Sequence, residues 1–387
     1  MRPPLDSKLP AVGTTIFTVM SRLAAEHGAI NLSQGFPDFE PPARLVELVG
    51  HHLRRDGAPQ NQYAPMAGLP SLRAAIVAKV ADCYARGVDA EHEVTVTAGG
   101  TEALFCAIQA VVHPGDEAIL LDPSYDSYAP AVRLAGGRAV HVPLRRPDFG
   151  VDWQRVRDAI TPRTRLLIVN FPHNPSGAVL SRDDLDTLAF ALRDTGVFVL
   201  SDEVYEHMLF DGRRHASLLT HAELAERSFV VSSFGKTYHA TGWKVGYCIA
   251  PSALTTEFRK VHQFVQFAVS SPMQAAIADF MGECPGHARE LPAFYQAKRD
   301  HFTRLLRDTR FRFVPSASTY FQLVDYSAIS DARDVEFAHR LTAEHGVAAI
   351  PISVFSERPP SDERIVRFCF AKHEATLDAA ADKLRKL

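Results

Sequence analysis

Short apolar runs and longer amphipathic stretches alternate through the middle of the chain. The apolar runs are rich in β-branched residues and lack polar alternation, as expected of strands that are buried on both faces. They occupy residues 94–97, 118–121, 166–169, 197–200, 229–231 and 245–250. Helical patterns separate several of them, for example at residues 101–112. This order predicts βαβ units, and therefore an α/β protein whose large domain has a mostly parallel sheet flanked by helices.

The last part of the chain follows a different pattern. Helix-like stretches and strand-like runs alternate there at residues 291–308, 318–326, 334–346, 364–371 and 374–387. We interpret this part as a smaller α+β domain, which the N-terminal segment joins. We therefore expect a large domain at 46–280 and a small domain formed by 1–45 and 281–387. A length of 387 residues suits two domains.

The composition narrows the class of protein. The net charge of −3 argues against a nucleic-acid partner bound through bulk charge. The 5 cysteines are scattered without a CxxC pair, and the 17 histidines show no ligand spacing, so we predict neither a disulfide framework nor a metal site. The start of the chain lacks the apolar core of a signal peptide, and no apolar run reaches the roughly 20 residues that span a bilayer. We expect a cytoplasmic protein with no membrane partner.

Polar residues follow several of the predicted strands at the point where each strand ends. In an open parallel sheet, ligands bind beyond these carboxyl ends. The positions are Gly99, Gly100, Thr101, Tyr125, Asn170, Asn174, Asp202, Tyr205, Ser233 and Lys236. Taken singly, most have an ordinary structural explanation: Asn174-Pro175 suits any turn, and Asp202 suits a helix N-cap. Their succession at strand ends favours one shared site.

Lys236 lies in a stretch of small and aromatic residues, SSFGKTYHATGWKVGY, which predicts a loop tucked into the protein. A lysine in a dry pocket has a lowered pKa and becomes an amine nucleophile and base that forms Schiff bases with carbonyl compounds. The whole set of residue types matches one aldehyde cofactor, pyridoxal 5'-phosphate. Its phosphate suits the N–H groups of the turn after Gly99, its ring nitrogen suits Asp202, and its ring face suits Tyr125.

Longer motifs carry a family resemblance. They include NLSQGFPDFEPP, NQYAP, TAGGTEAL, DPSYDSY, NFPHNPSG, SDEVYE, SSFGKTYHATGWKVGY and RIVRFCFAK. The chain resembles the fold-type I, class I pyridoxal-phosphate aminotransferases over nearly its whole length. Within that family it is most similar to the kynurenine aminotransferase-like subgroup, and there to bacterial methionine aminotransferases.

The resemblance implies roles for individual residues. Its catalytic set is Lys236, Asp202 and Tyr205, with Lys236 as the covalent partner of the cofactor. Asp202 then pairs with the ring nitrogen, Asn174 and Tyr205 bind the ring hydroxyl oxygen, and Tyr125 stacks on the ring. The phosphate-binding set is Gly99, Gly100, Thr101, Ser233 and Lys244, joined by Tyr63 from the neighbouring subunit of a homodimer. The substrate α-carboxylate is expected at Arg367, as a bidentate pair, with help from Asn174 and the backbone at Gly35.

The resemblance also bears on the substrate. Phe17, Phe36 and Tyr63 are expected to form an apolar or aromatic pocket. Kynurenine-handling relatives tend to carry a Phe-His pair where this chain has Val269-Ser270, which favours a flexible apolar side chain. We therefore expect ping-pong transamination of methionine and related neutral or aromatic L-amino acids to 2-oxo acids. The alternative is a kynurenine or glutamine aminotransferase with cysteine-conjugate β-lyase activity.

Overall fold

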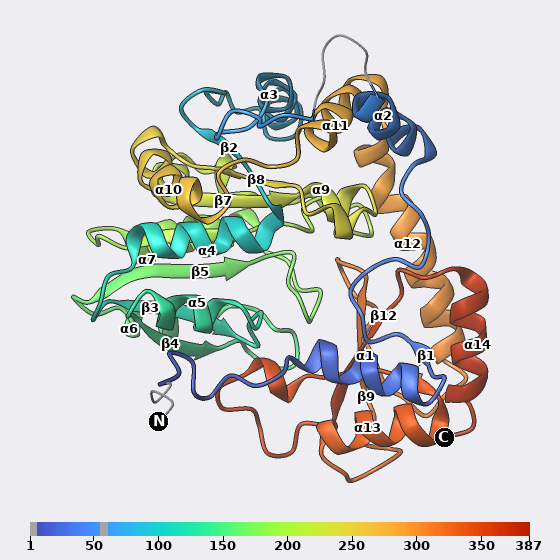
Figure 1. The fold of residues 1–387 in the computed structure, drawn as a ribbon. Helices are drawn as coiled ribbons and strands as arrows, with labels where there is room; N and C mark the ends of the chain where they lie inside the picture. Colours follow the sequence, from blue (N-terminus) through green and yellow to red (C-terminus); the bar gives the residue numbers. More distant parts are fainter. Residues whose placement is uncertain (1–5, 55–60) are drawn as a thin grey trace, which may run out of the picture.

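The computed structural model describes residues 6–54 and 61–387. A 7-stranded sheet with strand order β2-β8-β7-β6-β5-β3-β4 forms its centre (Figure 1). These strands are β2 (Val94–Thr97), β3 (Glu117–Asp122), β4 (Arg138–Pro143), β5 (Thr164–Asn170), β6 (Phe198–Asp202), β7 (Ser228–Ser233) and β8 (Gly246–Ile249). Strands β3 to β7 are parallel, whereas β8 runs antiparallel to both of its neighbours, β2 and β7. The predicted α/β class with a mostly parallel sheet is confirmed.

Helices cover both faces of this sheet (Figure 1). They are α2 (Ala43–Arg54), α3 (Pro70–Tyr84), α4 (Gly99–Val111), α5 (Tyr128–Leu134), α6 (Trp153–Asp158), α7 (Arg182–Leu192), α8 (Ala222–Ala225), α9 (Phe234–Thr237), α10 (Ser252–Val265) and α11 (Ser271–Glu283). Alternate residues of a strand enter different cores: in β5, Leu167 and Val169 belong to the core that includes residues of α7 and α11, whereas Leu166 and Ile168 belong to the core that includes residues of α4 and α10. This burial on both faces explains why the strands read as unbroken apolar runs.

A second, smaller layer contains the C-terminal part and the N-terminal segment (Figure 1). Its elements are α1 (Ile16–Glu26), β1 (Ile30–Asn31), α12 (His287–Leu306), β9 (Phe321–Asp325), α13 (Asp334–His345), β10 (Val347–Ala348), β11 (Ile350–Pro351), β12 (Ile365–Cys369) and α14 (Glu374–Leu384). Strands β11, β12 and β9 form an antiparallel sheet in that order. The N-terminal segment contributes because β1 pairs with β10, through Ile30 and Val347, and α1 packs on α13.

The structure departs from the predicted elements at β4 and around Lys236, among other places. Edge strand β4 was not predicted, because Val142 is its only buried residue and no apolar run marks it. Lys236 lies in the four-residue helix α9, where we predicted a loop, since one helical turn is too short to display a 3.6-residue repeat. Short 3-10 helices complete the described elements: η1 (Leu218–Thr220), η2 (Thr241–Trp243) and η3 (Ser353–Phe355). Among the described residues, no helix has the length and apolar character needed to cross a membrane.

Candidate active site

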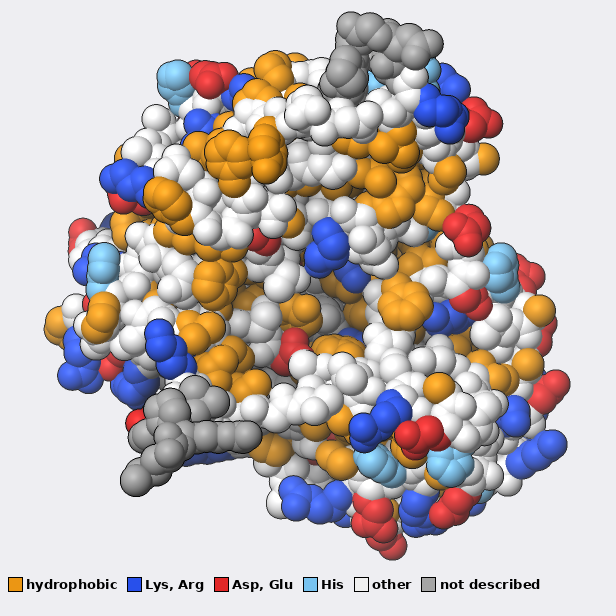
Figure 2. All heavy atoms as spheres, viewed as in Figure 1, with side chains coloured by type: hydrophobic (Ala, Val, Ile, Leu, Met, Phe, Trp, Pro, Cys, Tyr) orange, Lys and Arg blue, Asp and Glu red, His pale blue; other side chains and the backbone are white. Residues whose placement is uncertain are grey.

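A cavity of about 160 Å³ opens at the carboxyl ends of β5, β6 and β7. Its walls are Gly100, Thr101, Leu104, Tyr125, Asn170, Asn174, Asp202, Val204, Tyr205, Ser233, Lys236, Thr241 and Lys244. Most of the predicted cofactor residues belong to this set. In the space-filling view, the molecule is hollowed near its middle, between the parts of the chain that carry the two sheets (Figure 2).

Asp202 is the last residue of β6, and the register of the sheet sets Asn170 of β5 beside it. The Tyr128 hydroxyl donates to Asp202 Oδ2 over 2.6 Å, and the Asn170 side-chain amide donates to the Asp202 carbonyl over 2.9 Å. Burial raises the pKa of Asp202 to about 6, and the Tyr128 bond acts in the opposite direction. Tyr128 was missed from the sequence, although its position three residues after Tyr125, in the same motif, is a signal that sequence reasoning had available.

Lys236 faces the cavity from α9. Its Nζ lies 2.8 Å from the Tyr320 hydroxyl and 3.0 Å from the backbone oxygen of Gly35, and it lies 5.4 Å from the centre of the Tyr205 ring. Burial lowers the pKa of Lys236 to about 8. Tyr320, which also donates to the Gly35 oxygen, was missed from the sequence. Nothing in the strand-like run STYFQLVDY distinguishes this aromatic residue from its neighbours.

The phosphate-binding candidates gather where α4 begins. Gly100 and Thr101 lie in the first turn of α4, with their N–H groups at the positive end of the helix dipole. The Lys244 side chain lies across Gly99, since a Cβ atom at Gly99 would stand 3.3 Å from Lys244 Nζ. Ser233, at the end of β7, lines the same cavity. The N–H groups at the start of α4 and the charged amine of Lys244 therefore lie next to the same cavity.

Arg367 comes from β12, on the smaller sheet. One of its terminal nitrogens donates to Asn174 Oδ1 over 2.6 Å, and the other donates to the Ser33 carbonyl over 3.1 Å. The side chain is fully buried, and its Nε has no hydrogen-bond partner among the described residues. Burial lowers the pKa of Arg367 to about 10. The Phe17 ring lies 5.5 Å from the guanidinium carbon, so an aromatic wall flanks this cation.

Six predicted residues do not line this cavity, and two of them, Tyr63 and Phe36, are exposed; the other four are Gly99, Gly35, Phe17 and Arg367. Tyr63 is 85% exposed, and its ring contacts the Phe267 ring at 5.4 Å, on the surface of the molecule. Phe36 is 46% exposed, and its backbone oxygen accepts a hydrogen bond from Lys372. Gly99, Gly35 and Arg367 each contact a residue of the cavity wall, namely Lys244, Lys236 and Asn174 in that order, whereas Tyr63 and Phe36 are exposed.

A family model described as "Aminotransferase class I and II" matches residues 27–384. The chain belongs to the class I and II aminotransferases. This aminotransferase is 54% identical over 382 residues to the methionine aminotransferase of Escherichia coli (strain K12), with 99% of this chain and 98% of that protein covered. It is 35% identical to kynurenine–oxoglutarate transaminase 1 of Homo sapiens, with 94% of each chain covered.

Solved structures agree with these relatives. The Escherichia coli crystal structure that identified a methionine aminotransferase function is similar with a TM-score of 0.96 and 52% identity, over 100% of both chains. The N-succinyldiaminopimelate aminotransferase of Mycobacterium tuberculosis is similar with a TM-score of 0.95 and 37% identity, over 99% of this chain and 100% of that one. The aminotransferase has the fold-type I architecture that the sequence predicts.

Pyridoxal 5'-phosphate is the cofactor of this family, and the side chains at the cavity suit it. Asp202 is a buried carboxylate whose side-chain oxygens meet the Tyr128 hydroxyl and the Val204 N–H, and a protonated ring nitrogen would add a cationic partner. Lys236 offers an amine of lowered pKa for the aldehyde. The start of α4 and Lys244 offer positive charge for the phosphate.

Proposed function

We propose that this aminotransferase moves the α-amino group of methionine and related neutral or aromatic L-amino acids to a 2-oxo acid, with pyridoxal 5'-phosphate as cofactor. The observation that carries the proposal is that Lys236 of α9 and Asp202 of β6 line one cavity, while Arg367 of β12 donates to Asn174 in the wall of that cavity. An amine base, a carboxylate partner for a ring nitrogen and a cation for a carboxylate are the three groups that amino-group transfer requires.

The cofactor side of the site is formed by the end of the large sheet. When bound, the cofactor supplies an electron-withdrawing ring that stabilises negative charge at the substrate α-carbon. In our proposal Asp202 keeps the ring nitrogen protonated, and Tyr128 and Asn170 hold Asp202 in place. Tyr205 and Asn174 would bind the ring hydroxyl, and Tyr125 would hold the ring face; all three line the cavity. Gly99, Gly100, Thr101, Ser233 and Lys244 hold the phosphate.

The substrate side is formed by the smaller sheet and the N-terminal segment. Arg367 binds the α-carboxylate, because its unpaired buried Nε and its two terminal nitrogens suit two carboxylate oxygens. The backbone at Gly35 lies next to Lys236 Nζ and completes this end of the pocket. A carboxylate held here directs the substrate α-carbon toward the lysine.

Lys236 moves the proton. Its Nζ takes the proton from the substrate α-carbon and later returns it, so the amine must be uncharged when the proton leaves carbon. A pKa of about 8 leaves roughly a tenth of such groups uncharged at pH 7, far more than an ordinary lysine provides. Tyr320 and the Gly35 oxygen hold the amine at a fixed position while it carries the proton.

The preference for methionine rests on the relative at 54% identity, a methionine aminotransferase, and on the aromatic residues near Arg367. Phe17 and Phe355 pack against each other at 5.8 Å, and both lie within 6 Å of the Arg367 guanidinium carbon. Thioether sulfur packs favourably on aromatic rings. The second candidate, kynurenine or glutamine transamination with β-lyase activity on cysteine conjugates, is favoured by the similarity to kynurenine–oxoglutarate transaminase 1.

The test is a panel of amino donors with one 2-oxo acid acceptor, followed by mass spectrometry of the products. We expect methionine to give the highest kcat/KM, and Lys236→Ala to abolish turnover while the protein still binds the cofactor. Full activity in Lys236→Ala would refute the assignment of the lysine. Faster release of pyruvate and ammonia from a cysteine conjugate than transamination of methionine would favour the second candidate.

We also infer the larger organisation. A large domain at 46–280 and a small domain formed by 1–45 and 281–387 are supported by the two separate sheets and by the pairing of β1 with β10. A homodimer, in which Tyr63 reaches the phosphate of the neighbouring cofactor, is supported by the exposed aromatic side chains of Tyr63 and Phe264, which are 85% and 84% exposed. The free cysteines are consistent with a cytoplasmic location.

A further inference from the structure

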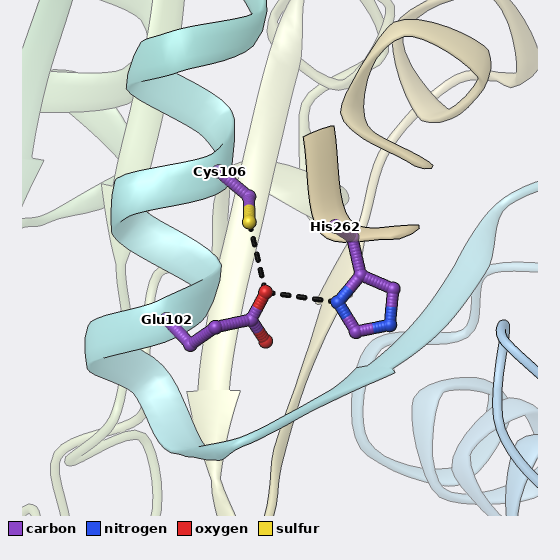
Figure 3. Close-up of side chains that lie close together, drawn as sticks. All are labelled: Glu102, Cys106 and His262. Carbon is purple, nitrogen blue, oxygen red and sulfur yellow. Dashed lines mark hydrogen bonds and ion pairs between the residues drawn. The ribbon is translucent and has the colours of Figure 1, made fainter. Parts of the chain in front are cut away.

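A buried cluster of three side chains joins α4 to α10 (Figure 3). Glu102 and Cys106 lie one turn apart on α4, and His262 lies in the last turn of α10. His262 Nδ1 and Cys106 Sγ each lie 2.8 Å from Glu102 Oε1. Cys106 and His262 are fully buried, so these contacts are shielded from solvent.

The hydrogen bonds of this cluster argue against a metal site, although the candidate ligand atoms lie within 4.8 Å of one another. His262 Nε2 lies 2.9 Å from the Met66 backbone oxygen, and a carbonyl only accepts, so Nε2 carries a proton. Nδ1 faces a carboxylate oxygen, and one further proton lies between these two groups. Both ring nitrogens of His262 therefore take part in hydrogen bonds within the protein. We call the hydrogen-bonded cluster of Glu102, Cys106 and His262 the clamp.

One side of the clamp holds the phosphate-binding turn. Glu102 Oε2 accepts a hydrogen bond from the backbone N–H of Ala98 over 2.9 Å. Ala98 immediately precedes Gly99, Gly100 and Thr101. The carboxylate thus binds the base of the turn with one oxygen and His262 with the other.

The other side of the clamp holds the segment that carries Tyr63. The His262 side chain donates to the oxygen of Met66, three residues after Tyr63. The backbone oxygen of His262 accepts from the N–H of Phe267, whose ring packs on the Tyr63 ring. His262 therefore reaches the Tyr63 segment by two routes, one through its side chain and one through its backbone.

We propose that the Glu102–His262 pair is a positioning element of the phosphate site, which holds the subunit's own phosphate-binding turn and the Tyr63 segment in a fixed relation. The inference rests on the proposed function, in which Tyr63 serves the neighbouring subunit's cofactor. The clamp touches neither Lys236 nor Asp202, so it acts on the phosphate end of the ligand and leaves the ring end unaffected.

The test compares pyridoxal 5'-phosphate with pyridoxal, which lacks the phosphate. In the cofactor-free full chain, His262→Phe keeps an aromatic ring next to Phe258 and removes both side-chain hydrogen bonds. We expect the Kd of pyridoxal 5'-phosphate to rise about tenfold or more, the size expected for losing buried hydrogen bonds, while that of pyridoxal changes less than about twofold. Equal weakening of both ligands, or of neither, would overturn the proposal.

A pair of variants at Glu102 separates positioning from loss of folding. Glu102→Gln keeps an oxygen for the Ala98 N–H and offers an N–H to His262, so we expect affinity for pyridoxal 5'-phosphate close to that of the wild type. Glu102→Leu removes both contacts with a side chain of similar size, and we expect the same phosphate-selective loss as in His262→Phe. A loss in Glu102→Gln as large as in Glu102→Leu would contradict a role based on hydrogen bonds.

A matched control is His52→Phe. His52 is also buried and paired with a carboxylate, Asp279, at 2.7 Å, but this pair joins α2 to α11. The His52 side chain makes no hydrogen bond to the turn or to the described residues of the Tyr63 segment. We expect an unchanged ratio of the two affinities, and a selective loss there would overturn the proposal. A wild-type protein that fails to bind pyridoxal 5'-phosphate or to transaminate would instead refute the proposed function.

Discussion

Tyr320 is the residue at the site whose importance depends most on three-dimensional structure. Its hydroxyl accepts from Lys236 Nζ and donates to the Gly35 oxygen, which Lys236 Nζ also contacts, so it holds the amine that moves the proton. We expect Tyr320→Phe to lower kcat about 10- to 100-fold with little change in cofactor affinity, since a misplaced base loses part of its usual contribution. Stopped-flow measurement of the half-reaction with α-deuterated methionine should show a larger isotope effect, because proton transfer then limits the rate.

The control for this variant is Tyr326→Phe. Tyr326 is equally buried and its hydroxyl donates to the Ala332 oxygen, far along the chain from Lys236. We expect no change in the isotope effect there. If Tyr320→Phe and Tyr326→Phe both lower kcat with an unchanged isotope effect, the hydroxyl of Tyr320 has only a structural role.

Lys236 illustrates a conflict between stability and function at a single residue. Its folded-state pKa, about 8, lies below the ordinary value of 10.5, so the unfolded state binds the proton more tightly and the charge destabilises the cofactor-free fold. We expect Lys236→Met to raise the free energy of unfolding at pH 7 by about 1–2 kcal/mol. The gain should shrink as the pH rises from about 8 toward 10.5, where wild-type stability recovers. Urea unfolding of the cofactor-free proteins at pH 7 and 10 measures this, and a gain that grows with pH would contradict it.

Some site residues were readable from the sequence because each follows a buried strand. Asp202 ends β6, and Asn174 and Lys236 come shortly after β5 and β7, and the parallel sheet brings the ends of those strands together. Tyr320 was not readable, since its role comes from a contact with a distant segment, and Tyr128 was missed although it lies in the same motif as Tyr125.

At the scale of elements, β8 packs closely against the turn that opens α4. A Cβ atom at Gly246 would lie 2.7 Å from the Ser232 oxygen and 2.9 Å from the backbone carbon of Gly99. Because these contacts are with backbone, we expect Gly246→Ala to destabilise the protein by about 1–3 kcal/mol and to weaken cofactor binding by displacing the turn. Thermal unfolding and cofactor titration measure the two effects.

Gly282 provides the matched comparison. It lies in α11 with open space around its Cβ position, so Gly282→Ala should stabilise the protein by up to about 1 kcal/mol through helix propensity. Cofactor affinity should not change in this variant. A Gly246→Ala protein as stable as the wild type would show that the turn and β8 adjust to each other more freely than the contacts indicate.

Elements with buried faces or long amphipathic patterns could be predicted, edge strand β2 among them, whereas the weakly buried edge strand β4 and very short elements could not. The runs of β5 and β6 are apolar because both faces of the sheet are covered. Strand β4 has one buried residue, and β1, β10 and β11 have two residues each, so no periodicity marks them. Such short strands form only because they are hydrogen-bonded to a partner strand, as β1 is to β10.

At the scale of the whole molecule, the exposed position of Tyr63 bears on the proposed dimer. Tyr63 lies outside the cavity of its own subunit and is 85% exposed, so a direct role at that cavity is excluded by its position. If it serves the neighbouring subunit, each active site combines Lys236 from one chain with Tyr63 from the other. A site shared between two chains predicts that mixed dimers of two variants regain activity, whereas a site within one chain does not.

Two inactive variants should then restore each other's activity. In a hybrid of Lys236→Ala and Tyr63→Ala chains, one site carries both defects and the other carries intact Lys236 and intact Tyr63. Random reassociation of equal amounts yields hybrids in half of the dimers, so we expect about one quarter of wild-type activity per subunit. The measurement requires mild dissociation, mixing, reassembly with pyridoxal 5'-phosphate and a methionine transamination assay. If the mixtures are no more active than the average of the separate variants, Lys236 and Tyr63 of one site come from the same chain. In that case every site in a hybrid dimer still lacks one of the two residues.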